Sequence, residues 1–288
     1  MQRKLGVSTW VWTARLTDES LAHLATQAAQ LGFDAIELPL EQLGDWDPER
    51  AKDLLGELGL HPVLAAVMPA GHNLIGVPRA EVEATQDYLR GCIDAAASLG
   101  ATTVAGPLYT ATGRLFALDD GQRRAAYAQL RTALAPLVEH AAARGITLAI
   151  EPLNRHETSL LNTIDQCFDA LEPLLGPGLG MGLDTYHLNI EEQDIAAAVA
   201  RATEHINHVQ LSANDRGIVG ADHFDWHGFV HALDLAGYDG PLCVKSFNPH
   251  NPTLAEAAAI WRPLASSQNA LAADSLAYLR NLQAGGLR

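Results

Sequence analysis

Short apolar runs alternate with longer amphipathic segments along the whole chain, and this alternation constrains the fold more than any other feature. The apolar runs have the length and flanking turn residues of buried strands, whereas the segments between them repeat apolar residues with the helical period. Such an alternation predicts a parallel sheet with helices on both faces. The expected strands are Leu5–Trp12, Ala35–Leu40, Pro62–Val67, Thr102–Ala105, Thr147–Glu151, Gly180–Asp184, His208–Leu211 and Leu242–Ser246.

The segments between the strands predict helices. These are Ser20–Gln30, Pro48–Glu57, Ala80–Ser98, Gln122–Arg144, Thr163–Leu174, Glu192–Thr203, Trp226–Leu235 and Leu254–Trp261. The period is clear in Gln122–Arg144, where Leu130, Leu134 and Val138 recur at every fourth position. Pro136 lies inside this segment. Because proline removes a backbone hydrogen bond, we expect a kink or a local break of the helix there.

Eight strand-then-helix units fill most of the 288 residues, and one more helix is expected near Asn269–Gln283. A chain of this size fits one (β/α)₈ barrel, which typically needs about 250 residues. We therefore predict a single TIM-barrel domain over residues 1–288 with an extra C-terminal helix. A doubly wound open sheet is the alternative. It is disfavoured because no Gly-rich nucleotide loop of the GxGxxG or Walker type follows the expected strands.

The charge and the cysteines limit the partners and the compartment. Lys and Arg number 19 against 34 Asp and Glu, which gives a net charge of −15. A chain this acidic is repelled by nucleic acids and by anionic membrane surfaces, and no apolar run approaches the ~18–20 residues of a membrane span. The three cysteines, Cys92, Cys167 and Cys243, form no CxxC pair. We therefore predict a cytoplasmic protein with neither a nucleic-acid nor a membrane partner.

Polar side chains lie at or near the ends of the later expected strands. Glu151 ends the fifth strand, Asp184 the sixth and Lys245 the eighth, and Gln210 lies in the seventh. In a barrel of this kind, catalytic groups lie at the C-terminal ends of the strands. One polar residue there can simply be solvated by the loops. Four that converge on one axis favour a functional pocket, because a buried carboxylate needs a cation or donors around it.

Four motifs after these strands resemble a known family. They are Gly106-Pro107-Leu108-Tyr109, Glu151-Pro152-Leu153-Asn154-Arg155 with Glu157, Leu183-Asp184-Thr185-Tyr186-His187-Leu188-Asn189, and Asn214-Asp215-Arg216-Gly217. Together they resemble the xylose-isomerase-like barrels, and within them the ketose 3-epimerases related to D-tagatose and D-psicose 3-epimerase. The resemblance covers nearly the whole chain. It implies an isomerase that acts on a small carbohydrate at the C-terminal mouth, with a homodimer as the expected assembly.

The resemblance also assigns roles to residues. In that family a Glu, an Asp, a His and a second Glu hold a divalent manganese, magnesium or cobalt ion. The two glutamates also move the C3 proton of the ketose. By position, Glu151 and Asp184 match the first two ligands. Glu157, His187 and Arg216 match residues that bind the sugar oxygens around C1 to C3.

Two of the four ligand positions depart from the family pattern. In His208-Val209-Gln210 the ligand His is replaced by Gln210, and Lys245 stands where the second catalytic Glu is expected. Ala213 also replaces a Glu that the family often carries three residues after the ligand His. In the family site, three carboxylates and the divalent ion give a net charge of −3 + 2 = −1. Here the carboxylates of Glu151 and Asp184 and the ammonium of Lys245 give −2 + 1 = −1 without an ion, since Gln210 is neutral.

These replacements change the expected cofactor. A protonated lysine offers no lone pair and repels a dication, and an amide oxygen is a poorer ligand than imidazole for these ions. We therefore expect no metal at the four family ligand positions, with Lys245 paired to Glu151 and Asp184. The alternative is a manganese, magnesium or cobalt ion at Glu151 and Asp184.

Three functions follow from this site. In the first, the Lys245 ammonium polarises the ketose C2 carbonyl and Glu151 is the base, so catalysis runs through an enediolate without a metal. A single base works best on one face, which also admits aldose–ketose isomerisation or a lyase reaction. In the second, Lys245 forms a Schiff base, which needs a lowered pKa that two flanking carboxylates oppose. In the third, the chain is a non-catalytic sugar-binding or regulatory relative that has lost its metal site.

Aromatic residues near the mouth admit two interpretations. Trp10 and Trp12, expected on one side of the first strand, form with Met68 and His72 either an apolar wall for the sugar or part of the core. His223 is expected to help line the pocket. The alternative is that this loop only starts a helix, with Asp225 as its cap and Trp226 packed in the core.

Overall fold

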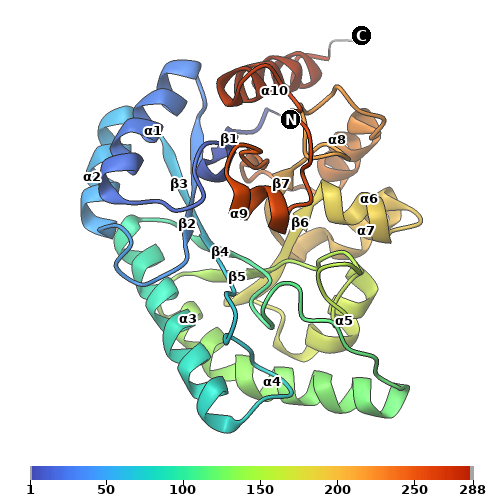
Figure 1. Ribbon diagram of the computed structural model, residues 1–288. Coiled ribbons are helices and arrows are strands. Elements are labelled where there is room, and N and C mark those ends of the chain that lie inside the picture. Colours follow the sequence, from blue (N-terminus) through green and yellow to red (C-terminus); the bar gives the residue numbers. More distant parts are fainter. Residues whose placement is uncertain (1, 286–288) are drawn as a thin grey trace.

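Eight parallel strands close into a barrel in chain order in the computed structural model, which describes residues 2–285 (Figure 1). They are β1 (Leu5–Ser8), β2 (Ala35–Leu40), β3 (His61–Ala66), β4 (Thr103–Gly106), β5 (Thr147–Ile150), β6 (Leu179–Asp184), β7 (Ile206–Leu211) and β8 (Leu242–Val244). The pairing of Gly6 in β1 with Cys243 in β8 closes the ring. The predicted (β/α)₈ barrel is confirmed, and the open-sheet alternative is wrong.

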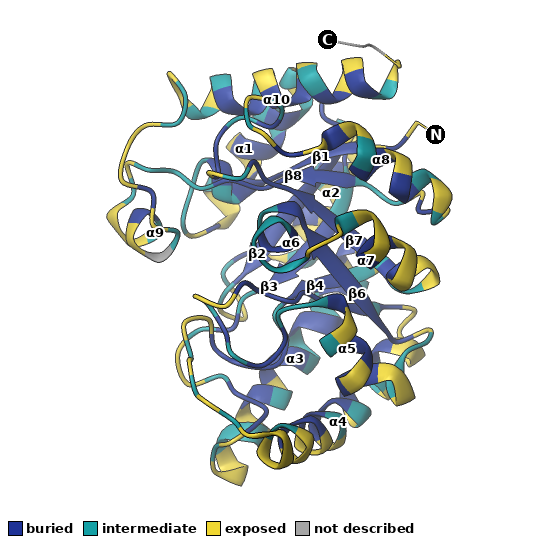
Figure 2. Ribbon diagram, turned by 90° about the vertical axis from the view of Figure 1, so that its right-hand side faces the viewer, coloured by how far each residue is buried: buried dark blue, intermediate teal, exposed yellow. Residues whose placement is uncertain are grey.

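Helices surround the barrel. They are α1 (Asp18–Leu31), α2 (Pro48–Leu58), α3 (Arg79–Leu99), α4 (Asp120–Ala143), α5 (Ile164–Leu171), α6 (Thr185–Glu191), α7 (Ile195–Ala202), α8 (Trp226–Leu235), α9 (Pro252–Ala257) and α10 (Gln268–Gln283). Short 3₁₀ turns cover Thr9–Val11, Glu172–Leu174 and Thr203–His205. Figure 2 shows buried strands at the centre and exposed residues on the outer faces of the helices. The extra C-terminal helix is confirmed as α10.

Local signals set the ends of the helices. The Thr17 side chain accepts from the Ser20 N–H at the start of α1, and Gly32 ends α1 with a φ of 95°. Asp47 caps α2 in the same way, and Gly59 ends it with a φ of 70°. Side-chain caps satisfy the free N–H groups of the first turn, and glycine adopts the left-handed conformation that closes a helix. The helices α1 and α2 therefore stop where the chain must return to the barrel.

Two expectations about the elements are wrong. β1 ends at Ser8 rather than Trp12, because the Ser8 hydroxyl accepts from the Trp10 N–H and starts a 3₁₀ turn. Trp10 and Trp12 therefore do not share one face of a strand. A local break at Pro136 is also absent from α4, which is continuous from Asp120 to Ala143, and a kink at Pro136 stays a prediction. Proline inside a helix costs about 3 kcal/mol. The buried side chains on both sides of it, such as Leu134 and Leu137, offset that cost by packing in the core.

One helix was not expected from the sequence. α6 begins directly after β6, where the Asp184 side chain accepts from the Tyr186 N–H and caps the helix. Among the helices of residues 2–285, none is long and apolar enough to cross a membrane. The predicted single domain over residues 1–288 includes Met1 and residues 286–288, which lie outside the described part of the chain. That domain assignment, the cytoplasmic location and the homodimer stay predictions.

Candidate active site

A cavity of about 280 Å³ lies at the C-terminal ends of the strands. It is lined by Glu151, Glu157, His187, Gln210, Arg216 and Lys245, together with apolar residues that include Trp10, Met68, Leu153, Phe247 and Leu254. Asp184 is fully buried beside these residues. The structure thus brings together the residues predicted as catalytic, substrate-binding or ligand positions, namely Glu151, Glu157, Asp184, His187, Gln210, Arg216 and Lys245.

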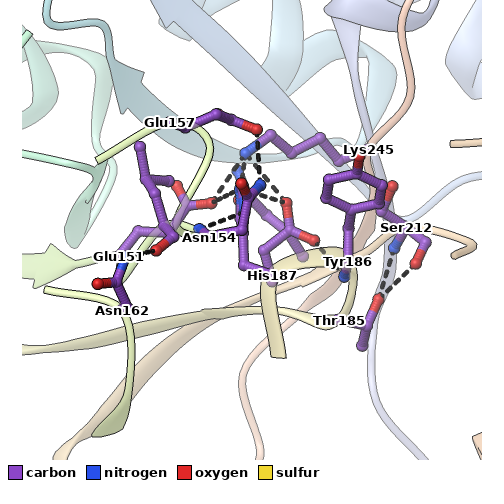
Figure 3. Close-up of polar contacts among 12 residues, drawn as sticks. Glu151, Asn154, Glu157, Asn162, Thr185, Tyr186, His187, Ser212 and Lys245 are labelled. Carbon is purple, nitrogen blue, oxygen red and sulfur yellow. Dashed lines mark hydrogen bonds and ion pairs between the residues drawn. The ribbon is translucent and has the colours of Figure 1, made fainter. Parts of the chain in front are cut away.

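The Lys245 ammonium contacts the other three family ligand positions. Its Nζ lies 2.8 Å from Gln210 Oε1, 3.1 Å from Glu151 Oε1 and 3.3 Å from Asp184 Oδ2. Figure 3 shows the side chain extending across the site toward Glu151. An ammonium has three N–H donors, so three acceptors can satisfy it completely. Lys245 therefore stands as a buried cation among Glu151, Asp184 and Gln210.

The charge state of Lys245 follows from this environment. Burial lowers the pKa of Lys245, but the charges of Glu151 and Asp184 outweigh it, and the pKa is raised above the ordinary value. The amine therefore stays protonated at neutral pH. A protonated amine is not a nucleophile, which argues against the Schiff-base interpretation.

Asp184 is held ionised by two cations. Its Oδ2 accepts from Arg216 Nη1 at 2.9 Å and lies near the Lys245 ammonium, while its Oδ1 caps α6. Burial raises the pKa of Asp184, but the charges of Arg216 and Lys245 outweigh burial and hold that pKa below the usual range. Asp184 is thus a permanent carboxylate that anchors Arg216 and Lys245.

Glu151 differs from Asp184 in its titration. Burial, with the nearby charge of Asp184, raises the pKa of Glu151 to about 7, although the charge of Lys245 opposes the rise. A general base works best when its pKa lies near the operating pH. Glu151 therefore has the protonation behaviour of an acid–base group, whereas Asp184 does not.

His187 is a neutral donor that faces both carboxylates. Its Nδ1 accepts from the backbone N–H of Asn154 at 3.0 Å, which assigns the ring proton to Nε2. That Nε2 lies 3.5 Å from Glu151 Oε1 and 3.8 Å from Asp184 Oδ2. Burial lowers the pKa of His187 well below the ordinary value, so the ring stays neutral. The Asn154 amide also donates to Glu157 at 2.8 Å, which orients that half-buried carboxylate.

Arg216 is held in an unusual backbone conformation. Its φ is 66°, in the left-handed region, and its carbonyl accepts from the Ser246 hydroxyl. Its guanidinium lies 3.8 Å from the centroid of the Tyr186 ring and donates to Ser212 Oγ at 3.0 Å. A non-glycine residue in such a conformation costs roughly 1–3 kcal/mol and persists only where its surroundings hold it. The loop is therefore built to aim this one side chain into the cavity.

Some residues near the site differ from the expectations. Trp12 donates to Asn269, and neither it nor His72 lines the cavity, so the apolar wall retains only Trp10 and Met68 from that set. His223 contacts the Asn214 amide at 2.8 Å away from the cavity. Trp226 is buried at the start of α8, as the helix-cap interpretation predicted.

One residue of the site, Glu37, was not predicted from the sequence; it lies fully buried in β2 and contacts Gln210. Its signal was available, because a carboxylate stands in the middle of the apolar run Ala35–Leu40. Buried charges of this kind require partners and so point to a polar network. No comparable signal identified Tyr186 or Ser212, which contact Arg216 only after the chain has folded.

Within residues 2–285, two buried groups carry enough donors to be tested as metal sites. Glu151, Asp184 and His187 form one, and Glu37, His208 and Cys243 form the other. In the first group the Lys245 ammonium lies 3.1 and 3.3 Å from the two carboxylates, where a ligated dication would face it directly. Like charges at such distances repel strongly in a buried site. The donors of the first group therefore do not fit a divalent ion in this arrangement.

The chain is similar to ketose epimerases. It is 32% identical over 280 residues to a ketose 3-epimerase of Arthrobacter globiformis, with 96% of each chain covered. A solved L-ribulose 3-epimerase shares 29% identity at a TM-score of 0.91, covering 99% of this chain and 95% of the other. A Methylomonas D-allulose 3-epimerase, solved with D-allulose, shares 28% identity at a TM-score of 0.88 and 97% coverage of each chain.

The family model described as "Xylose isomerase-like TIM barrel" matches residues 25–282. That range includes seven of the eight strands and every residue of the cavity except those that follow β1. The chain therefore belongs to the xylose isomerase-like TIM barrel family, and ketose 3-epimerases are among its homologues.

Proposed function

We propose that this protein is an isomerase of the ketose 3-epimerase type in which the Lys245 ammonium replaces a divalent ion. One observation carries the proposal: the Lys245 Nζ contacts Glu151, Asp184 and Gln210, the other three positions at which the family binds its metal. A fixed cation in a dry site stabilises developing negative charge well, because nothing must reorganise during the reaction.

The proposed substrate is a small ketose without a phosphate group. Relatives named for ketose substrates cover nearly the whole chain, and one of them was solved with D-allulose. The cations of the cavity are already engaged, since Arg15 pairs with Asp45 at 2.7 Å and Arg216 with Asp184 at 2.9 Å. A phosphate would have to displace these partners. An uncharged sugar needs only donors and acceptors such as Glu157.

The proposed first step moves one proton to Glu151. Glu151 removes the proton from the carbon next to the C2 carbonyl, and the electron pair of the broken C–H bond moves to the C2 oxygen. The resulting enediolate oxygen carries negative charge, which the Lys245 ammonium stabilises. His187 and Arg216, which present N–H donors to the same cavity, would bind the neighbouring oxygens.

The carbons that lose and receive the proton decide the product. If Glu151 takes a proton from C1 and delivers it to C2, while the proton of the C1 hydroxyl moves to the C2 oxygen, the result is aldose–ketose isomerisation. If Glu151 takes the proton from C3 and Lys245 donates a proton to the opposite face of C3, the result is 3-epimerisation. In that case Glu151 ends protonated and Lys245 neutral. Their contact of 3.1 Å would let one proton pass from Glu151 to Lys245 and restore the enzyme.

A non-catalytic sugar-binding protein is the second candidate. It is favoured by the two hydrogen bonds and the further ion pair of Lys245, which resemble a structural ion-pair network that stabilises two buried carboxylates. In this case the ketose would bind through Glu157, His187 and Arg216 without reacting.

The test is turnover in D₂O by protein whose metal content has been measured by mass spectrometry after treatment with a chelator. We expect less than one metal ion per protein chain. We also expect NMR to show deuterium incorporated at C3 of D-fructose or D-allulose. Deuterium at C1 would instead identify aldose–ketose isomerisation. Activity that appears only with added manganese would overturn the role given to Lys245. Binding by calorimetry without any exchange would favour the sugar-binding protein.

A further inference from the structure

A carboxylate lies in the interior of the barrel, below the cavity. Glu37 belongs to β2, is fully buried and does not line the cavity. The inside of such a barrel is normally filled by branched aliphatic side chains. A buried ionised carboxylate carries a desolvation cost of several kcal/mol unless partners compensate it. Its presence therefore requires an explanation beyond packing.

Two donors from β7 meet one oxygen of this carboxylate. Glu37 Oε2 accepts from His208 Nε2 at 2.6 Å and from Gln210 Nε2 at 2.8 Å. The other oxygen, Oε1, has no hydrogen-bond partner among the described residues. Burial raises the pKa of Glu37, but the hydrogen bond and charge of His208 outweigh it, and the pKa is lowered. Glu37 is thus an ionised group that accepts hydrogen bonds and donates none.

The Gln210 amide connects this carboxylate to the cavity. Its NH₂ donates to Glu37, and its carbonyl oxygen accepts from Lys245 Nζ at 2.8 Å. A carboxylate only accepts and an ammonium only donates, so this amide has one orientation that satisfies both ends. Rotation of the amide by 180° would face oxygen with oxygen and NH₂ with ammonium. Glu37 and Lys245 therefore select the same orientation of the amide, and Glu37 holds its NH₂ end.

We propose that Glu37 is a positioning residue that acts on the reaction through Gln210. By holding the amide NH₂, it keeps the carbonyl oxygen on the Lys245 ammonium and so fixes that ammonium between its three acceptors. Without the third acceptor, Lys245 would pair more closely with Glu151 and hinder it as a base. The catalytic consequence depends on the proposed function, whereas the orientation of the amide does not.

Two substitutions at Glu37 separate its hydrogen bonding from its charge. In Glu37→Gln the new carbonyl oxygen can accept both bonds that Oε2 accepts now. Glu37→Met keeps the approximate volume but offers no acceptor. Loss of such supporting partners typically lowers activity about 10- to 100-fold. We expect a loss of that size in kcat for Glu37→Met with KM little changed, and a loss of no more than about threefold for Glu37→Gln. Glu57→Met, on the exposed face of α2, is the matched control.

A double-mutant cycle tests whether Glu37 acts through Gln210. If it does, Glu37→Met added to Gln210→Met lowers kcat little further than Gln210→Met alone. Additive losses would indicate an independent role and overturn the proposal.

A measurement on the wild-type protein does not depend on activity or on the folding of a variant. The side-chain ¹⁵NH₂ signal of Gln210, assigned by its loss in Gln210→Met, should show slow exchange with solvent and one fixed environment. Exchange as fast as that of an exposed glutamine would overturn the proposal. A protected signal in a protein that turns over no ketose would leave the positioning role intact while the proposed function fails.

Discussion

The two halves of the barrel contribute different chemistry to one cavity. The strands β1 to β4, blue to green in Figure 1, end in small or apolar residues such as Leu40, Ala66 and Gly106. The strands β5 to β8 and the residues that follow them instead contribute the charged cluster of the mouth, namely Glu151, Asp184, Arg216 and Lys245, with the amide of Gln210. The first half adds the ion pair of Arg15 with Asp45, in which Arg15 is exposed. A sugar has an apolar face and polar edges, so a cavity with one apolar and one charged half can both hold it and act on it.

Glu37 is the exception to this division. It comes from β2 but reaches β7 inside the barrel, where it contacts His208 and Gln210. The apolar half thus supports the charged half from below while presenting a largely apolar wall to the cavity. A site residue can thus be supported from across the barrel, because inward side chains of opposite strands meet in the interior.

The largest effect is expected in the charged half at Lys245. Under the proposed function, Lys245→Met removes the cation that stabilises the enediolate, and we expect kcat to fall about 10²- to 10⁴-fold. Steady-state kinetics on chelator-treated protein measures the loss. Lys52→Met, on an exposed position of α2, is the matched control and should keep full activity. Full activity of Lys245→Met would show that the charged half does not use its cation.

Asp184→Asn should cost the most stability. It leaves the buried cations Arg216 and Lys245 without their shared carboxylate. Breaking a buried ion pair from one side costs about 3–5 kcal/mol. Denaturant unfolding gives the free energy, with Asp53→Asn on the exposed face of α2 for comparison. A change as small as that of the control would mean that water already solvates the two cations.

The pH dependence of the rate should report Glu151. Burial raises the pKa of this carboxyl to about 7, and a base must be ionised, so kcat/KM should rise tenfold per pH unit below pH ~7 and level off above it. The charge of Asp184 contributes to the rise in pKa, so the same limb should move to lower pH in Asp184→Asn. A pH–rate profile of both proteins is the measurement. If the rise of kcat/KM with pH occurs at the same pH in both proteins, a group other than Glu151 titrates.

The smallest effect is expected in the apolar half. Trp10 lines the cavity, and its ring lies 5.8 Å from that of Phe247. Trp10→Leu should raise KM by a few-fold with kcat nearly unchanged, since aromatic contacts are worth about 0.5–1.5 kcal/mol and bind substrate and transition state alike. Trp261→Leu is the control, because Trp261 is 76% exposed. A fall in kcat as large as that of Lys245→Met would end the distinction between the two halves.

Much of the fold could be predicted because its signals are local. The strand Ala35–Leu40 and the helix Trp226–Leu235 were predicted with their observed bounds. Errors arose where one hydrogen bond redirects the chain. The Ser8 hydroxyl ends β1 early, and the Asp184 carboxylate starts a helix directly after β6. Such side-chain bonds compete with the regular pattern and leave no periodic signal.

The sequence by itself determined the barrel, the family and the residues at the strand ends, because apolar periodicity and motifs are written along the chain. Only the tertiary structure decided what those residues do to one another. The contact of Lys245 with Glu151 joins positions 94 residues apart, and that of Glu37 with Gln210 joins positions 173 apart. The pKa of a buried group depends on burial and on neighbouring charges in space. Two carboxylates in similar sequence settings, Glu151 and Asp184, therefore titrate in opposite directions once the barrel closes.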